Sequence, residues 1–171
     1  MGEPREPRQE RGQRRVNEIL DAAADLIAEV GPEAVTVQAL AARAGASKGS
    51  MYHFFADRES VFLALANRHV RGLGAALADA AHARAGAVAA GTVDDAVKAF
   101  TAPLYAYADQ HPDLPRLMSE PASLTRLATQ RDALHVAVEA HAAWIVRARH
   151  PSLPADRVAL AATAMVAIHG A

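Results

Sequence analysis

Residues 36–65 constrain the fold of this chain most strongly, because short apolar helical patterns are interrupted there at fixed points. Thr36 precedes the segment VQALAARA, and threonine is a good helix N-cap. Gly45 follows as a residue that accepts the left-handed turn conformation. Ser47 then caps the next short helix. Two short helices joined by a glycine-containing turn of three to four residues are predicted to form a helix-turn-helix.

The second helix of the pair, SKGSMYHFF, combines a glycine with aromatic rings. Gly49 costs the helix about 1 kcal/mol relative to alanine, which is tolerable where the helix has to approach another molecule closely. Met51 and Phe55 are expected to face inward and to anchor the helix. The opposite side is polar and suits a DNA major groove, where base edges are read from a helix N-terminus. Its residues are Ser47, Lys48, Gly49, Ser50, Tyr52 and His53.

The rest of the chain is also predicted to be helical, with no strand pattern, internal repeat or phosphate-binding glycine loop. We expect a first helix that stops at Gly31, a helix capped by Asp57, and a helix opened by a capping box of Thr92 and Asp95 and kinked at Pro103. A long helix is expected over about 123–149, and a last helix starts near residue 154.

Composition excludes several classes of protein. Half of the 171 residues are hydrophobic and 5% are aromatic, which favours close-packed helices rich in alanine, leucine and valine. The absence of cysteine excludes disulfides, thiol chemistry and cysteine-bound zinc. No apolar run approaches the roughly 18 residues of a membrane span, and the N-terminus lacks the apolar core of a secretory signal. A cytoplasmic protein without a membrane partner is therefore expected.

Residues 15 to about 66 resemble the N-terminal domain of the tetracycline-repressor (TetR) family of bacterial transcription regulators. The matching stretches are ILDAAADLIAEVG and TVQALAARAGASKGSMYHFFADRESVFLAL. This resemblance covers about a third of the chain, and the remainder matches the family only in being helical and of similar length. It implies a homodimer that binds a palindromic operator in double-stranded DNA, and a repressor that a small-molecule effector releases.

The resemblance also implies roles for single residues. Major-groove contacts are implied for Ser47, Lys48, Gly49 and Ser50. Phosphate contacts are implied for Thr36 and Arg58, and contacts to phosphates or base edges for Tyr52 and His53. Arg58 stands where the family usually has lysine. Phe54 stands where the family often has histidine or tyrosine, and because its ring cannot donate a hydrogen bond we assign it to packing.

The fold class expected is all-α, with an N-terminal three-helix helix-turn-helix DNA-binding domain and a C-terminal helical bundle. The expected divisions are a flexible arm at 1–13, the DNA-binding domain at 14–60, and an effector-binding and dimerisation domain at 61–171. The arm is rich in arginine and can lie along a phosphate backbone, although a solvated tail is an equal alternative. Dimerisation is expected through the long helix and the last helix.

The local charge does not by itself indicate a nucleic-acid partner. Residues 1–60 contain eight basic and ten acidic side chains, so the region is not basic overall. Many of the acidic residues lie on the outer face of the first helix, which can point away from DNA. We therefore expect tight binding only as a dimer, with a modest dependence on salt.

The C-terminal region is expected to enclose an apolar cavity for a small molecule. Binding of this molecule shifts the fourth helix, the one capped by Asp57, and thereby the separation of the two DNA-reading heads of the dimer. The candidate effector-binding residues are Phe100, Leu104, Tyr107, Met118, His141 and Trp144. For any one of them, ordinary packing in a helical bundle is an equal alternative.

Metal binding and catalysis are not predicted. His135 and His141 share a helix with Glu139 between them, but a spacing of six does not place them on one face, and no HExxH-type pair occurs. No cofactor is expected, and no Ser-His-Asp or paired-carboxylate arrangement is readable, so the chain is not expected to be an enzyme. The alternative left open is a helical ligand-binding protein or enzyme whose helix-turn-helix is incidental.

Overall fold

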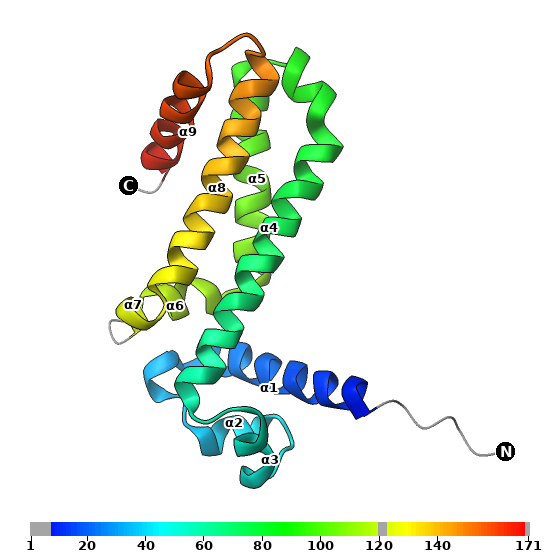
Figure 1. Cartoon of the computed structure of the whole chain (residues 1–171), viewed down its shortest axis with the longest axis vertical. Helices are drawn as coiled ribbons and strands as arrows, with labels where there is room; N and C mark the ends of the chain where they lie inside the picture. The colour runs from blue at the N-terminus through cyan, green and yellow to red at the C-terminus, as the bar shows by residue number, and fades with distance from the viewer. Residues whose placement is uncertain (1–7, 120–122, 170–171) are drawn as a thin grey trace, which may run out of the picture. The chain divides into compact units, whose positions relative to one another are not determined.

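The computed structural model describes residues 8–119 and 123–169, and every regular element in these ranges is helical (Figure 1). The predicted all-α class is therefore confirmed. The elements are α1 (Arg8–Val30), a short 3-10 helix η1 (Pro32–Ala34), α2 (Val37–Arg43), α3 (Lys48–Phe54), α4 (Arg58–Ala90), α5 (Val93–Gln110), α6 (Asp113–Ser119), α7 (Ser123–Arg126), α8 (Ala128–Arg149) and α9 (Ala155–His169).

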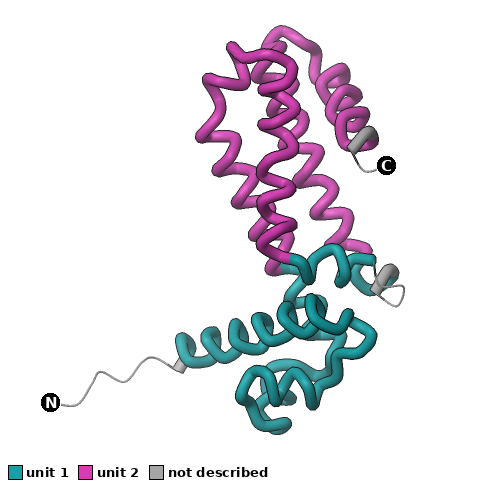
Figure 2. The backbone as a smooth tube through the Cα atoms, turned by 180° about the vertical axis from the view of Figure 1, so that it is seen from behind, with its two compact units in different colours: residues 1–67, 112–127 teal, residues 68–111, 128–171 magenta. Residues whose placement is uncertain are grey.

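The chain divides into two compact units, shown in different colours in Figure 2. Unit 1 contains residues up to 67 together with 112–127, and so holds α1–α3, the start of α4, α6 and α7. Unit 2 contains residues 68–111 and those from 128 onward, and so holds the rest of α4, α5, α8 and α9. Segment 112–127 joins unit 1 because Leu117 and Leu127 are buried in its core.

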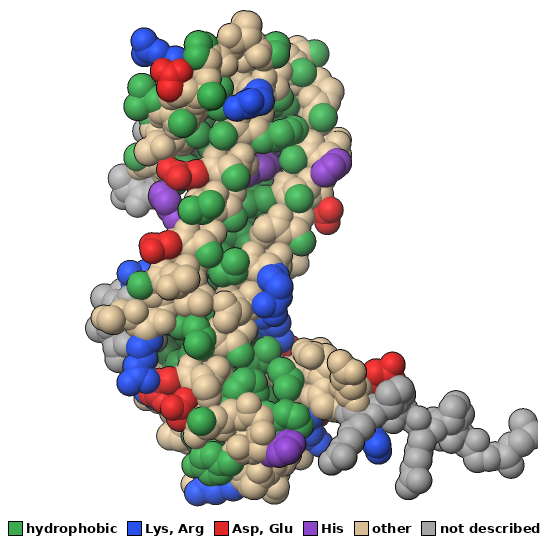
Figure 3. Space-filling model, in the orientation of Figure 1, with side chains coloured by type: hydrophobic (Ala, Val, Ile, Leu, Met, Phe, Trp, Pro, Cys, Tyr) green, Lys and Arg blue, Asp and Glu red, His purple; other side chains and the backbone are tan. Residues whose placement is uncertain are grey.

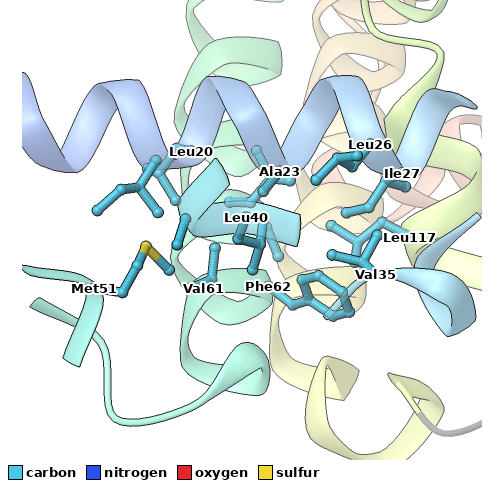
Figure 4. Close-up of a cluster of buried hydrophobic side chains, with 14 of the residues drawn as sticks. Leu20, Ala23, Leu26, Ile27, Val35, Leu40, Met51, Val61, Phe62 and Leu117 are labelled. Atoms are coloured by element: carbon cyan, nitrogen blue, oxygen red, sulfur yellow. The ribbon is translucent and has the colours of Figure 1, made fainter. Parts of the chain in front are cut away.

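The core of unit 1 is formed by apolar side chains from α1, α2, α3 and α4 (Figure 4). Ile19, Ala23 and Ile27 recur on one face of α1 and are fully buried. Leu40 of α2 and Met51 of α3 are buried against them, which confirms that Met51 faces inward. A helix of seven residues is too short to be stable alone in water, so this packing holds α3 in place.

The predicted caps of α2 and α3 are confirmed. The Thr36 hydroxyl accepts a hydrogen bond from the Ala39 amide at 3.1 Å, and the Ser47 hydroxyl accepts one from the Ser50 amide at 3.1 Å. Gly45, between the two helices, has a φ of 58°, the left-handed value that glycine adopts without strain. These three residues fix where each short helix begins and how the chain turns between them.

The predicted starts of α4 and α5 are confirmed as well. The Asp57 carboxylate accepts a hydrogen bond from the Ser60 amide at 2.7 Å. Thr92 and Asp95 form the expected capping box, in which each side chain accepts from the other residue's backbone amide. The hydrogen bonds from Thr92 hold the pKa of the Asp95 carboxyl below its ordinary value.

Two helix boundaries differ from those expected. Helix α1 begins at Arg8, so residues 8–13 of the expected arm are helical, while residues 1–7 lie outside the described part of the chain. A hydrogen bond from the Gln13 side chain to that of Asn17 and an ion pair between Arg15 and Glu18 support this polar turn of helix. The long helix expected at 123–149 is divided into α7 and α8 at Leu127, whose side chain is buried in unit 1.

Unit 2 has its own apolar core, in which Phe100 and Ile145 are fully buried. One guanidinium nitrogen of Arg149 donates to the carbonyl oxygens of Val88, Gly91 and Thr92, and thereby fixes the turn between α4 and α5. None of the described helices combines the length and apolarity that a bilayer crossing requires.

Candidate nucleic-acid interface and ligand pocket

The outer side of α3 presents most of the residues predicted to contact DNA. Ser47, Lys48, Gly49, Tyr52 and His53 are exposed, with Tyr52 at 55%. Lys48 and Tyr52 form no hydrogen bond or ion pair with another described residue, so the ammonium and the phenol are available to a partner. The structure thus brings a positive charge, hydroxyl groups and an imidazole together on one short helix.

Ser50 and Thr36 contribute to the same region in different ways. Ser50 is half-buried, and its amide is used in capping α3. Thr36 is exposed at the start of α2, and its oxygen accepts the capping hydrogen bond from Ala39. Because a hydroxyl also carries one donor hydrogen, Thr36 can cap its helix and still donate to a phosphate oxygen.

Gly49 is not required by the fold. A Cβ atom added there would meet only the Ser47 hydroxyl oxygen, at 3.9 Å, which is an ordinary van der Waals distance. Its φ is not positive, unlike that of Gly45. An exposed helical glycine that neither sterics nor backbone conformation demands supports the interpretation that another molecule approaches α3 closely at this point.

Arg58 differs from the other candidates because its guanidinium is engaged within the protein. Its Nη1 donates to the carbonyl oxygens of Pro32, Glu33 and Val35 at 3.1–3.3 Å. Its Nη2 pairs with Glu59 at 3.3 Å, and the group lies 5.4 Å from the centre of the Phe62 ring. In this arrangement Arg58 fixes the loop before Thr36, and its contact with a phosphate stays a prediction.

Replacing Arg58 with methionine is expected to destabilise the protein by about 2 kcal/mol, because three carbonyl oxygens lose a charged donor while the aliphatic stem is kept. Urea unfolding measures the change. Arg71→Met is the matched control, since Arg71 is exposed and has no hydrogen bond or ion pair to another described residue. Equal unfolding midpoints for the two variants would show that the Arg58 contacts contribute no stability.

A polar pocket of about 450 Å³ lies between α1 and α3. Its α1 side includes Arg11, Arg14 and Arg15, and its α3 side includes Ser50 and His53. Arg11, from the expected arm, and Arg14 and Arg15 just after it are therefore helical and lie beside Ser50 and His53 of α3. These arginines place positive charge beside α3, partly balanced by Glu18, which lines the same pocket and pairs with Arg15.

The acidic residues of α1 are partly neutralised on another side of unit 1. The Arg43 guanidinium forms a two-point ion pair with the Glu29 carboxylate, at 2.6 and 2.9 Å, and lies 3.8 Å from Asp25. The hydrogen bonds of this pair lower the pKa of Glu29 and raise that of Arg43. An even balance of charges in the sequence is thus compatible with a locally basic region beside α3.

A second pocket, of about 600 Å³, lies within unit 2 between α4 and α8. Small and apolar side chains line it together with His82, His141 and Trp144. Figure 3 shows hydrophobic side chains between these helices, with histidine among them. Of the predicted effector-binding residues, His141 and Trp144 line this pocket.

The other predicted effector-binding residues have packing roles. Phe100 is buried in the apolar core of unit 2, and Leu104 packs against it. The Tyr107 hydroxyl lies 3.2 Å from Nδ1 of the buried His69. Met118 packs against the core of unit 1, so it does not belong to the pocket of unit 2.

The small residues of α4 that line the pocket were not among the predicted effector-binding residues, although their helical spacing is visible in the sequence. Gly74, Ala78, Ala81 and Ala85 recur three or four residues apart, which places them on one face of a helix. A face of small residues leaves room beside it when the facing helix also carries alanine, as α8 does at Ala137.

His141 is buried, and the burial lowers the pKa of its imidazole. The unfolded chain therefore binds more protons than the folded protein below the ordinary histidine pKa of 6.5. We expect the free energy of unfolding to fall as the pH is lowered from about 7 to about 5, a range above the titration of ordinary carboxyl groups. In His141→Phe this dependence is expected to be weaker, as measured by urea unfolding at several pH values; identical slopes would contradict the expectation.

Within the described ranges, no group of three or more His, Asp or Glu side chains is placed to hold a metal ion. The His135 imidazole lies 3.5 Å from the Glu139 carboxylate one turn away, which is an exposed pair on α8. A metal site is accordingly not proposed.

Comparison with known proteins confirms the resemblance of the N-terminal region. Residues 19–65 match the family model described as "Bacterial regulatory proteins, tetR family". The HTH-type transcriptional repressor AcnR of Corynebacterium diphtheriae is 46% identical over 52 residues, which cover 30% of this chain and 27% of that protein. AcnR of Corynebacterium glutamicum is 47% identical over 49 residues. The chain thus matches about a quarter of the length of these relatives.

Solved structures share the fold over most of the chain. The TetR family transcriptional regulator PfmR from Thermus thermophilus is 25% identical, with a TM-score of 0.58 over 88% of this chain and 80% of that one. A protein of Mesorhizobium loti assigned to the TetR family is 16% identical, with a TM-score of 0.61 over 95% of this chain and 96% of that one. The likeness therefore extends beyond the matched N-terminal region to the helical remainder.

Proposed function

We propose that this chain, whose residues 19–65 are those of a TetR-family regulatory protein, is a homodimeric transcriptional repressor. It binds a palindromic operator in double-stranded DNA and is released by a small-molecule effector. Lys48 and Tyr52 of α3, which are exposed and have no partner among the described residues, carry this proposal most directly. The protein acts by binding rather than by catalysis, and its place is the cytoplasm, where the DNA of a bacterium lies.

In this function, α3 enters the major groove and Lys48 reads base edges near its N-terminus. Tyr52 and His53 lie further along the helix, within reach of phosphates or base edges. Arg11 and Arg14 of α1, beside the same face, contact the phosphate backbone. These arginines supply the positive charge that the composition of residues 1–60 does not indicate.

Helices α8 and α9, which pack closely on each other, supply the surface for the second copy. Val136 of α8 is 61% exposed and Leu160 of α9 is 64% exposed. Burying such side chains between two copies stabilises a dimer, and a two-fold axis matches a palindromic site. Light scattering at micromolar protein concentration measures the mass of the species in solution.

Helix α4 links the two functions along one element. Val61, Phe62 and Leu65 in its first part belong to the core that supports α3, while Gly74 and Ala81 further along line the unit 2 pocket. A ligand that shifts α4 therefore changes the placement of α3, which is the proposed means of release. The alternative, with which the pocket is equally compatible, is a helical ligand-binding protein whose helix-turn-helix is incidental.

Selection of fragments from bacterial genomic DNA separates these functions. The proposed function predicts that the protein enriches fragments that share a palindrome, and that their affinity falls as salt is raised because phosphate contacts release counterions. Recovery of no common site, or an affinity that does not change with salt, would support the alternative.

A further inference from the structure

The pocket of unit 2 contains no charged group among its lining residues, all of which lie in the described part of the chain. Its polar groups are the imidazoles of His82 and His141 and the indole of Trp144. No opposite charge lines the pocket to pair with an ion, so an ion would lose hydration there without gaining an ion pair. A charged occupant is therefore disfavoured.

The hydrogen bonding of His141 determines which of its ring nitrogens can accept a hydrogen bond from a ligand in the pocket. Its Nε2 lies 3.1 Å from the Ala99 carbonyl oxygen, and since a carbonyl only accepts, Nε2 carries the hydrogen. Burial lowers the pKa of the ring, which keeps it neutral near pH 7. Nδ1 is then a hydrogen-bond acceptor, and it has no partner among the described residues.

His82, on the α4 wall, is exposed, but one of its ring nitrogens is likewise held by a backbone carbonyl. Its Nδ1 lies 2.7 Å from the Ala78 carbonyl oxygen, so Nδ1 carries the hydrogen and Nε2 of the neutral ring is an acceptor. Nε2 likewise has no partner among the residues that the structure describes. In their neutral forms, the two histidines thus offer acceptors to the pocket, one from α4 and one from α8.

Aromatic rings are stacked at the α8 side of the pocket. The His141 ring lies 6.2 Å from that of Phe100 at an interplanar angle of 18°, and 5.7 Å from that of Trp144 at 15°. Trp144 is the outer member of this stack and is only half-buried. A flat ring in the pocket can continue the stack against the indole, an arrangement that adds about 0.5–1.5 kcal/mol to simple burial.

We infer that this pocket binds a neutral, planar aromatic molecule that carries a hydrogen-bond donor, such as a phenol. The donor is directed to Nδ1 of His141 or Nε2 of His82, and the ring packs against Trp144. A volume of about 600 Å³ suits a molecule of one or two rings. The inference deepens the proposed function and rests on it in one respect, the identification of this ligand as the effector.

Four probes of similar size separate the features of this ligand. 4-tert-Butylphenol has the ring and the donor, 4-tert-butylanisole lacks the donor, 4-tert-butylcyclohexanol lacks the flat ring, and 4-tert-butylbenzoate is an anion. Trp144 is the only tryptophan of the chain, so its fluorescence reports binding, and calorimetry provides an independent affinity. The phenol is expected to bind at least about fivefold more tightly than each of the others.

Variants connect this preference to the pocket. His141→Phe removes the acceptor and keeps a ring, so the affinity for the phenol is expected to fall about fivefold and that for the anisole to stay within about twofold. Ala81→Leu fills the pocket from α4 without touching a histidine, so it is expected to abolish binding of both probes. This second variant keeps the test decisive if His141→Phe does not fold.

The inference is overturned if no probe binds the wild-type protein, if the cyclohexanol or the benzoate binds as tightly as the phenol, or if Ala81→Leu leaves binding unchanged. Because these titrations contain no DNA, their failure leaves the proposed function standing. Conversely, binding of the phenol by a protein that selects no DNA fragment would support the ligand-binding alternative.

Discussion

Replacing Gly49 with leucine is expected to reduce affinity for the selected DNA by about 100-fold or more while leaving the fold intact. Gly49 is exposed, and a Cβ added there meets a single neighbour at 3.9 Å, so we expect the free protein to accommodate the larger side chain. In the proposed DNA complex, the same atoms would occupy the space between α3 and the bases. The loss of DNA affinity is therefore expected from steric exclusion of the DNA and not from unfolding of the protein.

The stability of this variant is expected to rise, by up to about 1 kcal/mol, because leucine has a higher helix propensity than glycine. Affinity is measured by titration of a labelled operator fragment, and stability by urea unfolding. A loss of DNA affinity together with a gain in stability would show that α3 is shaped for the close approach of DNA. A gain in stability with no loss of affinity would show that Gly49 is merely exposed.

Gly86→Leu is the matched control for this experiment. Gly86 is an exposed helical glycine of α4 in unit 2, and a Cβ added there meets no atom within 4 Å. The substitution is expected to give a similar gain in stability with no change in DNA affinity. If Gly49→Leu binds DNA as tightly as Gly86→Leu, no partner approaches α3 at this glycine.

Local features of the fold could be predicted from the sequence because they depend on neighbouring residues. The caps at Thr36 and Ser47 and the box of Thr92 and Asp95 each satisfy backbone amides within three residues. The inward position of Met51 follows from helical spacing. These features sufficed to place the helix-turn-helix and the residues on its outer side.

Features that depend on distant parts of the chain could not be predicted in this way. Leu117 and Leu127 are buried in unit 1 although they lie far beyond its other helices in the sequence, and no local pattern indicates such a partner. The first turns of α1 lack an apolar stripe and are supported by polar pairs, so periodicity did not reveal them. The engagement of Arg58 with carbonyls near Val35 likewise requires the tertiary fold.

The candidate sites likewise differ in whether they depend on neighbouring residues or on distant parts of the chain. The α3 residues share one short helix, so sequence alone grouped them, and the structure adds Arg11 and Arg14 beside them. The pocket of unit 2 is formed by two helices far apart in sequence, and only His141 and Trp144 were anticipated. The prediction chose large side chains such as Phe100 and Tyr107, which are buried in the interior. The pocket is instead formed beside small side chains such as Gly74 and Ala81.

The most direct test of DNA reading by α3 is the paired removal of Lys48 and Tyr52. Both side chains are exposed and lack partners among the described residues, so replacing them with alanine is expected to leave the unfolding midpoint unchanged. In the proposed complex each contributes a contact to phosphate or base, and losing both is expected to weaken operator binding by about 100-fold.

The chain offers a closely matched control, since Lys98 is its other lysine and Tyr105 of α5 is an exposed tyrosine in unit 2. Operator affinity is measured for Lys48→Ala/Tyr52→Ala and for Lys98→Ala/Tyr105→Ala, which make the same change in composition and charge. We predict that the first pair loses binding and that the second retains it. Equal affinity of the two double variants would contradict the assignment of α3 as the DNA-reading helix.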